Sequence, residues 1–263
     1  MLPEQTSLKI VSYNINGIRS AIRKGLVDWL DDNDFDIVCF QETKAFQGSV
    51  PVLLFESLGY RHYWHSAKRK GYSGVATLTR IPPTKVHQGL GIEKYDCEGR
   101  VLRTDFDDWT LFNCYFPNGG SGEERHRYKM EFLDDFFCWL EAFREEQPNI
   151  VVVGDYNIAH HKIDIHDPVR NQHKSGFRLE ERERLSQWFS TGWVDSFRHL
   201  YPDQVSYTWW RQTQFARSVD KGWRLDYQSV TDEMADRIRT VAHLHDAFHS
   251  DHCPVVMELG NEV

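Results

Sequence analysis

Short apolar runs separated by polar loops recur along most of the 263-residue chain. Runs of this length, bounded by turn residues, are typical of β-strands rather than of helices. We therefore predict strands over Leu8–Tyr13, Asp36–Phe40, Gly74–Leu78, Val101–Phe106, Thr110–Tyr115, Ile150–Val153, Leu225–Val230, Thr240–Leu244 and Cys253–Leu259.

Two stretches have the spacing of an amphipathic helix instead. The first lies between the first two strands and places on one face Ile22, Leu26, Trp29 and Leu30. The second is longer, and its apolar positions are Tyr128, Phe132, Phe136, Leu140 and Phe143. Ser121 and Glu124 have the S-x-x-E spacing of a capping box at its start, and Pro148 marks its end.

Many strands with a few amphipathic helices are typical of an α/β domain in which helices cover sheets. The length alone permits two ordinary domains or one large one. No linker rich in Pro, Gly or Ser, low-complexity stretch or repeat divides the chain, so we predict a single catalytic domain over residues 1–263. Nine Trp, eleven Tyr and sixteen Phe supply enough apolar surface for a sizeable core.

The N-terminus and the cysteines favour an intracellular protein. The first seven residues form neither a basic nor an apolar leader, and no stretch approaches the roughly 18 apolar residues of a membrane span. Five cysteines, without any C-x-x-C pair, predict reduced and buried thiols. The net charge of −8 argues against nonspecific coating of nucleic acid, but it permits a local basic rim. We expect a soluble, cytoplasmic protein.

Polar clusters stand where four of the predicted strands begin or end. They are Asn14–Gly17, Gln41–Lys44, Gly154–Asn157 and Ser250–His252. Each alone is ordinary turn chemistry, because Asn, Asp and Gly are common turn residues. Four such clusters at strand ends could instead converge on one rim, and they then predict a site there.

The donors in these clusters suit Mg²⁺. Carboxylate and amide oxygens prevail, and Mg²⁺ prefers such hard ligands; the candidates are Asn16, Glu42, Asp155, Asn157 and Asp251. His252 adds a titratable group that can stabilise developing charge. A zinc site among His160, His161, His166, His243, His245 and His249 is the alternative, but their spacings match no common zinc signature. His243 and His245 alternate as strand residues on one face do.

Seven segments in the same order resemble the exonuclease III type of apurinic/apyrimidinic (AP) endonucleases, within the endonuclease/exonuclease/phosphatase superfamily. The segments are Asn14–Arg19, Gln41–Lys44, Gly71–Ala76, Tyr115–Asn118, Gly154–His160, Gly222–Tyr227 and Ser250–Pro254. None is decisive alone, but together they cover nearly the whole chain.

The resemblance implies a fold and a set of catalytic roles. The fold is a four-layer α/β sandwich, with two packed mixed β-sheets flanked by helices and the active site at one end. Glu42 would be the principal ligand of Mg²⁺, for which Mn²⁺ can substitute, with Asn16 and Asp251 as further metal residues. Asn14 and Asn157 would orient the phosphate and the water. Asp155 would align or deprotonate that water, a role in which Tyr115 has also been proposed, and His252, held by Asp226, would meet the phosphate oxygen.

The resemblance also implies contacts with double-stranded DNA that carries abasic sites or blocked 3′ ends, bound by a monomer. Phosphate or DNA contacts would come from Asn14, Asn118, Arg125, Asn171, Lys174 and Arg217. Trp209 and Trp223 would wall a pocket for the flipped-out abasic sugar. Lys174 stands where many relatives have Asn, and Ser121 where some have an Arg inserted into the DNA.

Basic residues near the motif ends suggest a footprint for the backbone of DNA. They are Arg19, Arg23, Lys24, Lys68, Arg69, Lys70, Arg211, Arg217 and Lys221. Two other functions remain open: an inositol-phosphate or lipid phosphatase of the same superfamily, and a noncatalytic binding scaffold. The scaffold predicts loss of one of Glu42, Asp155, Asp226 or His252, and all four are present.

Overall fold

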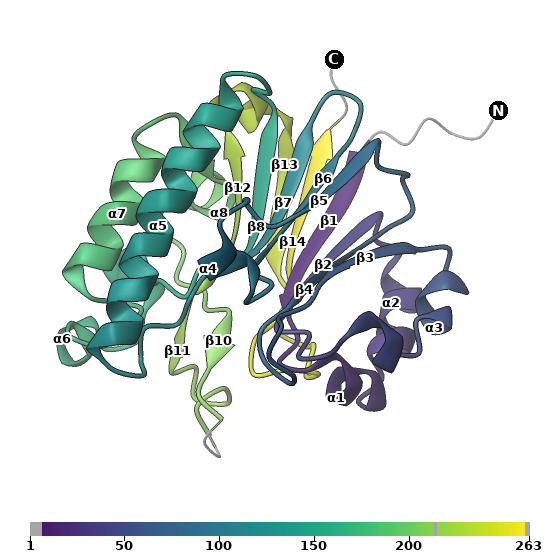
Figure 1. The fold of residues 1–263 in the computed structure, drawn as a ribbon. Helices are drawn as coiled ribbons and strands as arrows, with labels where there is room; N and C mark the ends of the chain where they lie inside the picture. Colours follow the sequence, from purple (N-terminus) through teal and green to yellow (C-terminus); the bar gives the residue numbers. More distant parts are fainter. Residues whose placement is uncertain (1–6, 213–214, 261–263) are drawn as a thin grey trace.

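The computed structural model describes residues 7–212 and 215–260, and within them the apolar runs form two sheets of six strands each (Figure 1). The first sheet has the order β13-β14-β1-β2-β4-β3. Its members are β1 (Ser7–Asn14), β2 (Ile37–Gln41), β3 (Arg61–His65), β4 (Val75–Thr79), β13 (Ile238–His243) and β14 (Val255–Gly260). β1 and β2 are parallel and the other pairs are antiparallel, so the sheet is mixed.

The second sheet has the order β5-β6-β7-β8-β12-β9. Its members are β5 (Lys85–Gln88), β6 (Val101–Asp105), β7 (Thr110–Tyr115), β8 (Ile150–Asp155), β9 (Trp193–Asp195) and β12 (Asp226–Thr231). Here β7 and β8 form the parallel pair. A separate two-stranded ribbon joins β10 (Trp209–Trp210) to β11 (Gly222–Trp223).

Both faces of the central strands are buried, which explains why their sequences are continuous apolar runs. Alternate residues of a strand point to opposite faces. In β1, Leu8 and Ile10 join the core between the two sheets, whereas Val11 and Tyr13 join the core under the N-terminal helices. The same alternation in β8 sends odd-numbered valines inward and Ile150 and Val152 outward.

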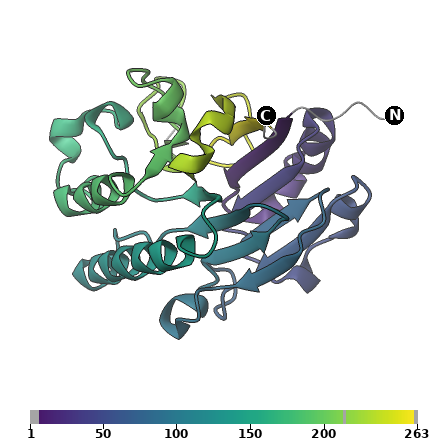
Figure 2. The same cartoon turned by 90° about the horizontal axis from the view of Figure 1, so that it is seen from above.

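Helices cover the outer faces of both sheets. The outer face of the first sheet packs against residues of α1 (Ile18–Arg23), α2 (Leu26–Asn33) and α3 (Leu53–Glu56), and that of the second against α5 (Glu123–Arg144) and α7 (Leu179–Phe189). In Figure 2, α5 runs along the outside of the molecule on the side away from β1. The remaining helices are α4 (Glu93–Asp96), α6 (Pro168–Asn171) and α8 (Ser196–Leu200), with 3₁₀ turns at Gln47–Ser49, Lys162–Asp164 and Asp232–Arg237. These layers confirm the predicted four-layer sandwich of two mixed sheets.

Each predicted strand has a counterpart whose ends differ by a few residues at most. Five strands of the described residues escaped prediction, namely β3, β5, β9, β10 and β11, and β3 and β5 show why. The sequences of both are rich in polar residues, and much of β5 is exposed at the edge of its sheet. Helix α7 also escaped prediction, because a charged run interrupts its apolar positions.

The capping box predicted from Ser121 and Glu124 is wrong. Helix α5 begins at Glu123, and its N-cap is Gly122, which has no side chain to offer and adopts a φ of 105°. The helix ends at Arg144, before Pro148. All five cysteines are free, as expected, but Cys138 is exposed and Cys97 half-buried, so only the other three are buried.

Candidate active site

The ends of β1, β2, β7 and β8 meet at one end of the sandwich, where they border a cleft of about 1060 Å³. β12 begins at the same end, because Asp226 pairs with Asp155 across the antiparallel β8–β12 ladder. Loops that follow or precede these strands therefore bring distant residues together. The residues that line the cleft include Glu42, Tyr115, Asn118, Asp155, Asn157, Asn171, Lys174, Trp209, Trp223, Asp251 and His252.

Asn14 joins two carboxylates at the floor of this site. Its side-chain Nδ2 donates to Glu42 Oε1 at 2.9 Å and to Asp155 Oδ2 at 2.8 Å. Asp155 Oδ1 accepts from the backbone N–H of Asn157 at 2.8 Å, and Asn157 in turn accepts from Asn118. Asn14 and Asp155 are fully buried or nearly so, which means that their positions are fixed by packing as well as by hydrogen bonds.

The two carboxylates differ in their electrostatic surroundings. Burial raises the pKa of Asp155, and the negative charges of Asp226 and Glu42 raise it further. Burial opposes ionisation of Glu42 as well, but the Lys44 ammonium outweighs it and lowers the pKa of Glu42 below its usual value. Burial also raises the pKa of Tyr115, so its phenol is a neutral hydroxyl at pH 7.

His252 and Asp226 form a buried pair next to Asp155. His252 Nδ1 lies 2.8 Å from Asp226 Oδ2, and His252 Nε2 lies 4.0 Å from Asp155 Oδ2. Thr208 Oγ1 donates to the same Asp226 oxygen at 2.6 Å. Burial lowers the pKa of His252, but the charge of Asp226 and its hydrogen bond outweigh burial and raise this pKa to about 10. The ring is thus oriented and held cationic by its partner.

The donor set fits a divalent cation. Carboxylate oxygens of Glu42 and Asp155 lie within 4.8 Å of each other and of a ring nitrogen of His252. The two carboxylates can bind the cation, whereas the protonated ring of His252 has no lone pair to offer. The Lys44 ammonium contacts Glu42 Oε2 at 2.7 Å and also the side-chain oxygen of Asn16. Oxygen atoms of Glu42 and Asn16 therefore already converge on a positive charge. Asp251 stands next to them, since its Oδ1 accepts from Asn16 Nδ2 at 2.9 Å.

Four of these residues have a left-handed backbone, with φ values of 45°, 50°, 51° and 53° at Asn16, Glu42, Lys44 and Asn157. Such values are uncommon for residues other than glycine and concentrate at functional sites. Gly154 meets a different constraint, because a Cβ there would lie 1.8 Å from the Cys114 carbonyl oxygen. Only glycine lets β8 lie this close to β7 immediately before Asp155.

Trp209 and Trp223 form one wall of the cleft. Their rings meet edge to face with centroids 5.9 Å apart, and both are half-buried against a small apolar cluster of Ala159, Ile165, Phe177 and Leu225. Trp209 Nε1 donates to Asp251 Oδ2 at 3.1 Å, which ties the wall to the polar residues. The pair is thus both packed and accessible from the cleft.

The predicted phosphate-binding residues divide into two groups. Asn14, Asn118, Asn171 and Lys174 lie at the cleft, and Lys174 is exposed at its rim. The structure gives the other two a different setting. Arg125 donates to both oxygens of Glu98 and to Tyr72, and Arg217 donates to the carbonyls of His245, Ala247 and Ser250.

The predicted basic footprint is only partly at the cleft. Arg211 and Lys221 line it, and Arg170 and Arg178, which the sequence analysis did not select, line it as well. Lys24 donates to the carbonyl of His249, and Lys68 pairs with Glu93. The arginines of the segment near residue 170 gave no signal in the sequence beyond their charge.

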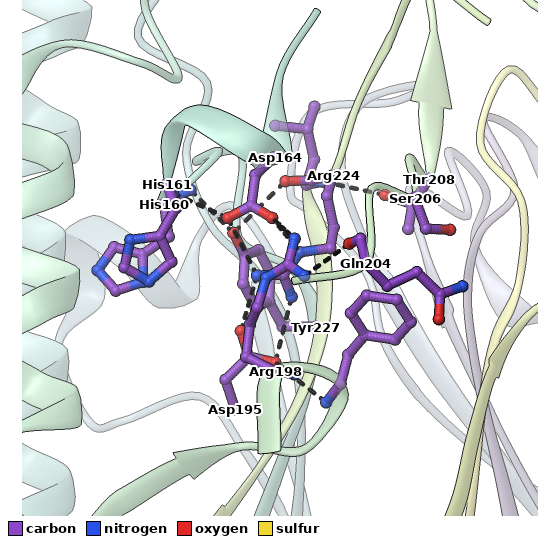
Figure 3. A network of polar contacts seen from close by, with 12 residues as sticks. His160, His161, Asp164, Asp195, Arg198, Gln204, Ser206, Thr208, Arg224 and Tyr227 are labelled. Atoms are coloured by element: carbon purple, nitrogen blue, oxygen red, sulfur yellow. Dashed lines mark hydrogen bonds and ion pairs between the residues drawn. The ribbon is translucent and has the colours of Figure 1, made fainter. Parts of the chain in front are cut away.

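The zinc alternative finds no support in the described part of the chain. There, the one group of three or more His, Cys, Asp or Glu side chains able to hold an ion is Glu42, Asp155 and His252. His243 and His245 do not alternate along a strand, because β13 ends at His243. The rings of His160 and His161 lie side by side at a tilt of 39°, with centroids 3.8 Å apart (Figure 3). His160 Nε2 lies 2.7 Å from Ser186 Oγ.

The burial of His160 predicts a loss of stability in acid. Burial, aided by the charge of His161, lowers the pKa of His160 to about 3, whereas an unfolded His titrates near 6.5. As the pH falls from 7 to 5, the unfolded chain binds a proton that the folded chain excludes, which costs up to about 2 kcal/mol. Urea unfolding of the His160→Gln variant should show a smaller loss between these pH values than the wild type. Equal losses in both proteins would contradict this assignment.

Two residues that support the site escaped the sequence analysis. Thr208 holds Asp226, and Lys44, although part of a matching segment, was given no role. Nothing local marks Thr208, because it becomes important only through the pairing of distant segments. Lys44 could have been noticed as a cation two residues from a predicted metal ligand.

Comparison with known proteins agrees with this geometry. Residues 11–252 match the Endonuclease/Exonuclease/phosphatase family. The chain belongs to this family. Among its members, an exodeoxyribonuclease from Bacillus subtilis is 37% identical over 94% of this chain and 98% of its own length. The DNA repair nuclease APEX1 of Danio rerio is 39% identical over 97% of this chain and 83% of its own.

A solved member of the family has the same fold. The structure of an AP endonuclease from Archaeoglobus fulgidus superposes with a TM-score of 0.88 at 30% identity, covering 97% of this chain and 100% of that one. None of the helices in the described part of the chain has the length and apolar composition that a membrane span requires.

Proposed function

We propose that the chain is a Mg²⁺-dependent DNA-repair phosphodiesterase. It cleaves the backbone 5′ to abasic sites and also acts on blocked 3′ ends as a 3′-phosphodiesterase and 3′→5′ exonuclease. The observation that carries the proposal is the meeting, in one cleft, of two carboxylates bridged by Asn14 with the His252–Asp226 pair, beside a wall of two tryptophans. The names of the relatives, nucleases and AP endonucleases among them, support it.

Glu42 is the principal metal ligand in this proposal, with Asn16 and Asp251 beside it. These oxygens suit Mg²⁺, and Mn²⁺ shares their preference for carboxylate and amide donors. When bound, the cation supplies positive charge against the scissile phosphate and the leaving oxygen. A cation held by Glu42 and Asn16 would need the same oxygens that Lys44 contacts, so Lys44 would have to release them.

Asp155 acts on the attacking water. Its Oδ1 accepts from the backbone N–H of Asn157, whereas its Oδ2 accepts from the side chains of Asn14 and Asn157 and lies 4.0 Å from His252 Nε2. Because Oδ2 is the oxygen that faces His252, we assign it as the atom that accepts the water proton. The water oxygen bonds to phosphorus as the bond to the leaving 3′ oxygen breaks. Tyr115, a neutral hydroxyl, serves as a hydrogen-bond donor rather than as the base.

His252 stabilises charge on the phosphate. Its Nδ1 is bonded to Asp226, so Nε2 is left to donate toward a non-bridging oxygen as negative charge grows there. Asn14 and Asn157 hold the Asp155 carboxylate and the phosphate in position relative to each other. The duplex then contacts the rim of the cleft at Lys174, Asn118 and Asn171. In this proposal the protein acts as a monomer in the cytoplasm.

A panel of substrates tests the proposal. End-labelled duplexes with one abasic analogue, with a 3′-phosphate and without damage are compared with an inositol phosphate at equal Mg²⁺. We expect the abasic duplex to be cleaved fastest and the inositol phosphate to be inert. Efficient release of phosphate from the inositol compound, without cleavage of any duplex, would support the phosphatase alternative and reject the proposal.

The wall formed by Trp209 and Trp223 predicts that the preference for abasic over undamaged duplex depends on the shape of the pocket. Replacing both Trp209 and Trp223 with Ala should lower the ratio of abasic to undamaged cleavage by about tenfold or more, because discrimination by fit in an apolar pocket is of this size. Hydrolysis of a small phosphodiester should change much less. Gel assays of both duplexes and a colorimetric assay of the small diester measure the two effects.

Loss of packing alone has a different signature. Trp139 of α5 is also half-buried, but it lies away from the cleft and packs against Phe143 of the same helix and Phe112 of β7. Trp139→Ala should lower the melting temperature and leave the ratio unchanged. If the double variant behaves like Trp139→Ala, the two cleft tryptophans are core residues and the pocket assignment is wrong.

A further inference from the structure

Two segments far apart in the sequence form neighbouring parts of the cleft. One runs from Asp164 to Gly176, lines the cleft from His166 onward and includes Asn171 and Lys174; the other is β11, which carries Trp223. Backbone contacts join them: Ile165 forms an antiparallel bridge with Trp223, and His166 N donates to Gly222 O at 2.9 Å. We call the first of these segments, residues 164–176, the rim segment.

A buried guanidinium lies directly behind this junction (Figure 3). Arg224 is fully buried, and its backbone N–H donates to the carbonyl of Asp164 at 2.7 Å. Its side chain binds the Asp164 carboxylate with both arms, Nε to Oδ1 at 2.8 Å and Nη2 to Oδ2 at 3.1 Å. Asp164 therefore fixes the start of the rim segment to the residue that follows Trp223.

The same guanidinium binds a second carboxylate that has no part in the cleft. Arg224 Nη1 and Nη2 donate to the two oxygens of Asp195 at 3.1 and 2.8 Å. Asp195 ends β9 and caps α8 through the N–H groups of Phe197 and Arg198. Arg198 in turn contacts Asp164, so two arginines and two aspartates form a nearly buried cluster of balanced charge.

The forked geometry suits a positioning role. A planar guanidinium holds each carboxylate in a fixed orientation, which a single ammonium cannot do. Asp164 is fully buried, and the cationic cluster keeps its pKa well below the usual range. The pair sits between the tryptophan wall and the predicted phosphate contacts without itself lining the cleft.

We propose that the Asp164–Arg224 pair is a positioning device that holds the rim segment against Trp223 and so sets the affinity of the cleft for damaged duplex DNA. The inference rests on the proposed function. Neither residue touches the scissile phosphate. Their effect should therefore appear in duplex binding and in KM, while the hydrolytic step that Glu42, Asp155 and His252 carry out continues at nearly its normal rate.

The two carboxylates of Arg224 offer a matched comparison. Asp164→Asn and Asp195→Asn each remove one negative charge from the same guanidinium, but only Asp164 belongs to the rim segment. Binding to a fluorescent abasic duplex is measured by anisotropy in EDTA, and kcat and KM are measured with Mg²⁺. We expect Asp164→Asn to raise Kd and KM about tenfold or more, because the contact residues of the rim segment would be misplaced. The kcat of this variant should stay within about twofold of the wild-type value. Asp195→Asn should leave Kd and KM within about twofold.

A third variant covers the case in which Asp164→Asn does not fold. Arg224→Lys keeps the positive charge but cannot grip both carboxylates, so it should also raise Kd with little change in kcat. Equal effects of Asp164→Asn and Asp195→Asn on Kd, or an unchanged Kd in both Asp164→Asn and Arg224→Lys, would overturn the inference. Failure of the wild type to bind or cleave any abasic duplex would instead reject the proposed function.

Discussion

Replacing Glu42 by Gln is expected to lower turnover on an abasic duplex by about a thousandfold or more. The substitution keeps the shape of the side chain and removes the charge that attracts the cation, whose contribution to the barrier is several kcal/mol. The Lys44 ammonium would then face an uncharged amide, although the fold around Asn14 should persist. Single-turnover cleavage at saturating and at limiting Mg²⁺ measures the loss.

A carboxylate at the far end of the sandwich provides the control. Asp105 pairs with Arg103 and accepts from Thr110, at the end of β7 opposite Tyr115. Asp105→Asn removes a partly buried, paired charge as Glu42→Gln does, but it should leave turnover within about twofold. A Glu42→Gln enzyme that kept the wild-type rate at limiting Mg²⁺ would show that the metal is bound elsewhere.

Removing His252 or Asp226 should cause losses that do not multiply. The 2.8 Å contact makes them a unit, in which Asp226 orients the ring and favours its cationic form. His252→Asn and Asp226→Asn should each reduce kcat by about 10²–10³, the usual cost of a group that stabilises transition-state charge. The double variant should be little worse than His252→Asn alone.

The same three variants can also show that His252 and Asp226 act independently of each other. If the loss in the double variant equals the product of the single losses, the two residues act separately and the role of Asp226 is not to hold the imidazole. Thr208→Val gives a graded comparison, because it removes the hydroxyl that donates to the Asp226 carboxylate and accepts from the backbone N–H groups of Leu225 and Asp226, and it keeps the His252 contact. Its loss should be smaller than that of Asp226→Asn.

The fold could be predicted where burial determines the residue pattern. β1, β2 and β8 are buried on both faces over most of their length, so their sequences are mainly apolar and their ends are close to the predicted ones. β5 and α7 could not be found in the same way, because edge position and surface exposure let polar residues fill them. The cap of α5 was mispredicted because the helix begins after Gly122 without a side-chain cap, which leaves no side-chain pattern to read.

The site was predictable where its residues follow strand ends. Glu42, Asp155 and Asn14 meet because parallel strands bring their carboxyl ends to one edge. His252 follows from the cluster before the last strand, and the resemblance to a known family added Asp226 as its partner. The contacts of Arg125 and Arg217 depend on side chains and carbonyls from distant segments, so neither the charge of these arginines nor the resemblance revealed their partners. The Asp164–Arg224–Asp195 cluster depends on three separate segments, which explains why local patterns did not reveal it.

Analysis of the cleaved ends of a single duplex tests the central claim most directly. A duplex with one abasic analogue, labelled at the 5′ end of the damaged strand, is incubated with the protein in Mg²⁺ or in EDTA. We expect one product in Mg²⁺, ending in a 3′-hydroxyl immediately 5′ to the lesion, which a polymerase can extend. EDTA should abolish it. An intact duplex in Mg²⁺, or the same cleavage in EDTA, would contradict the assignment of the cleft as a metal-dependent AP endonuclease site.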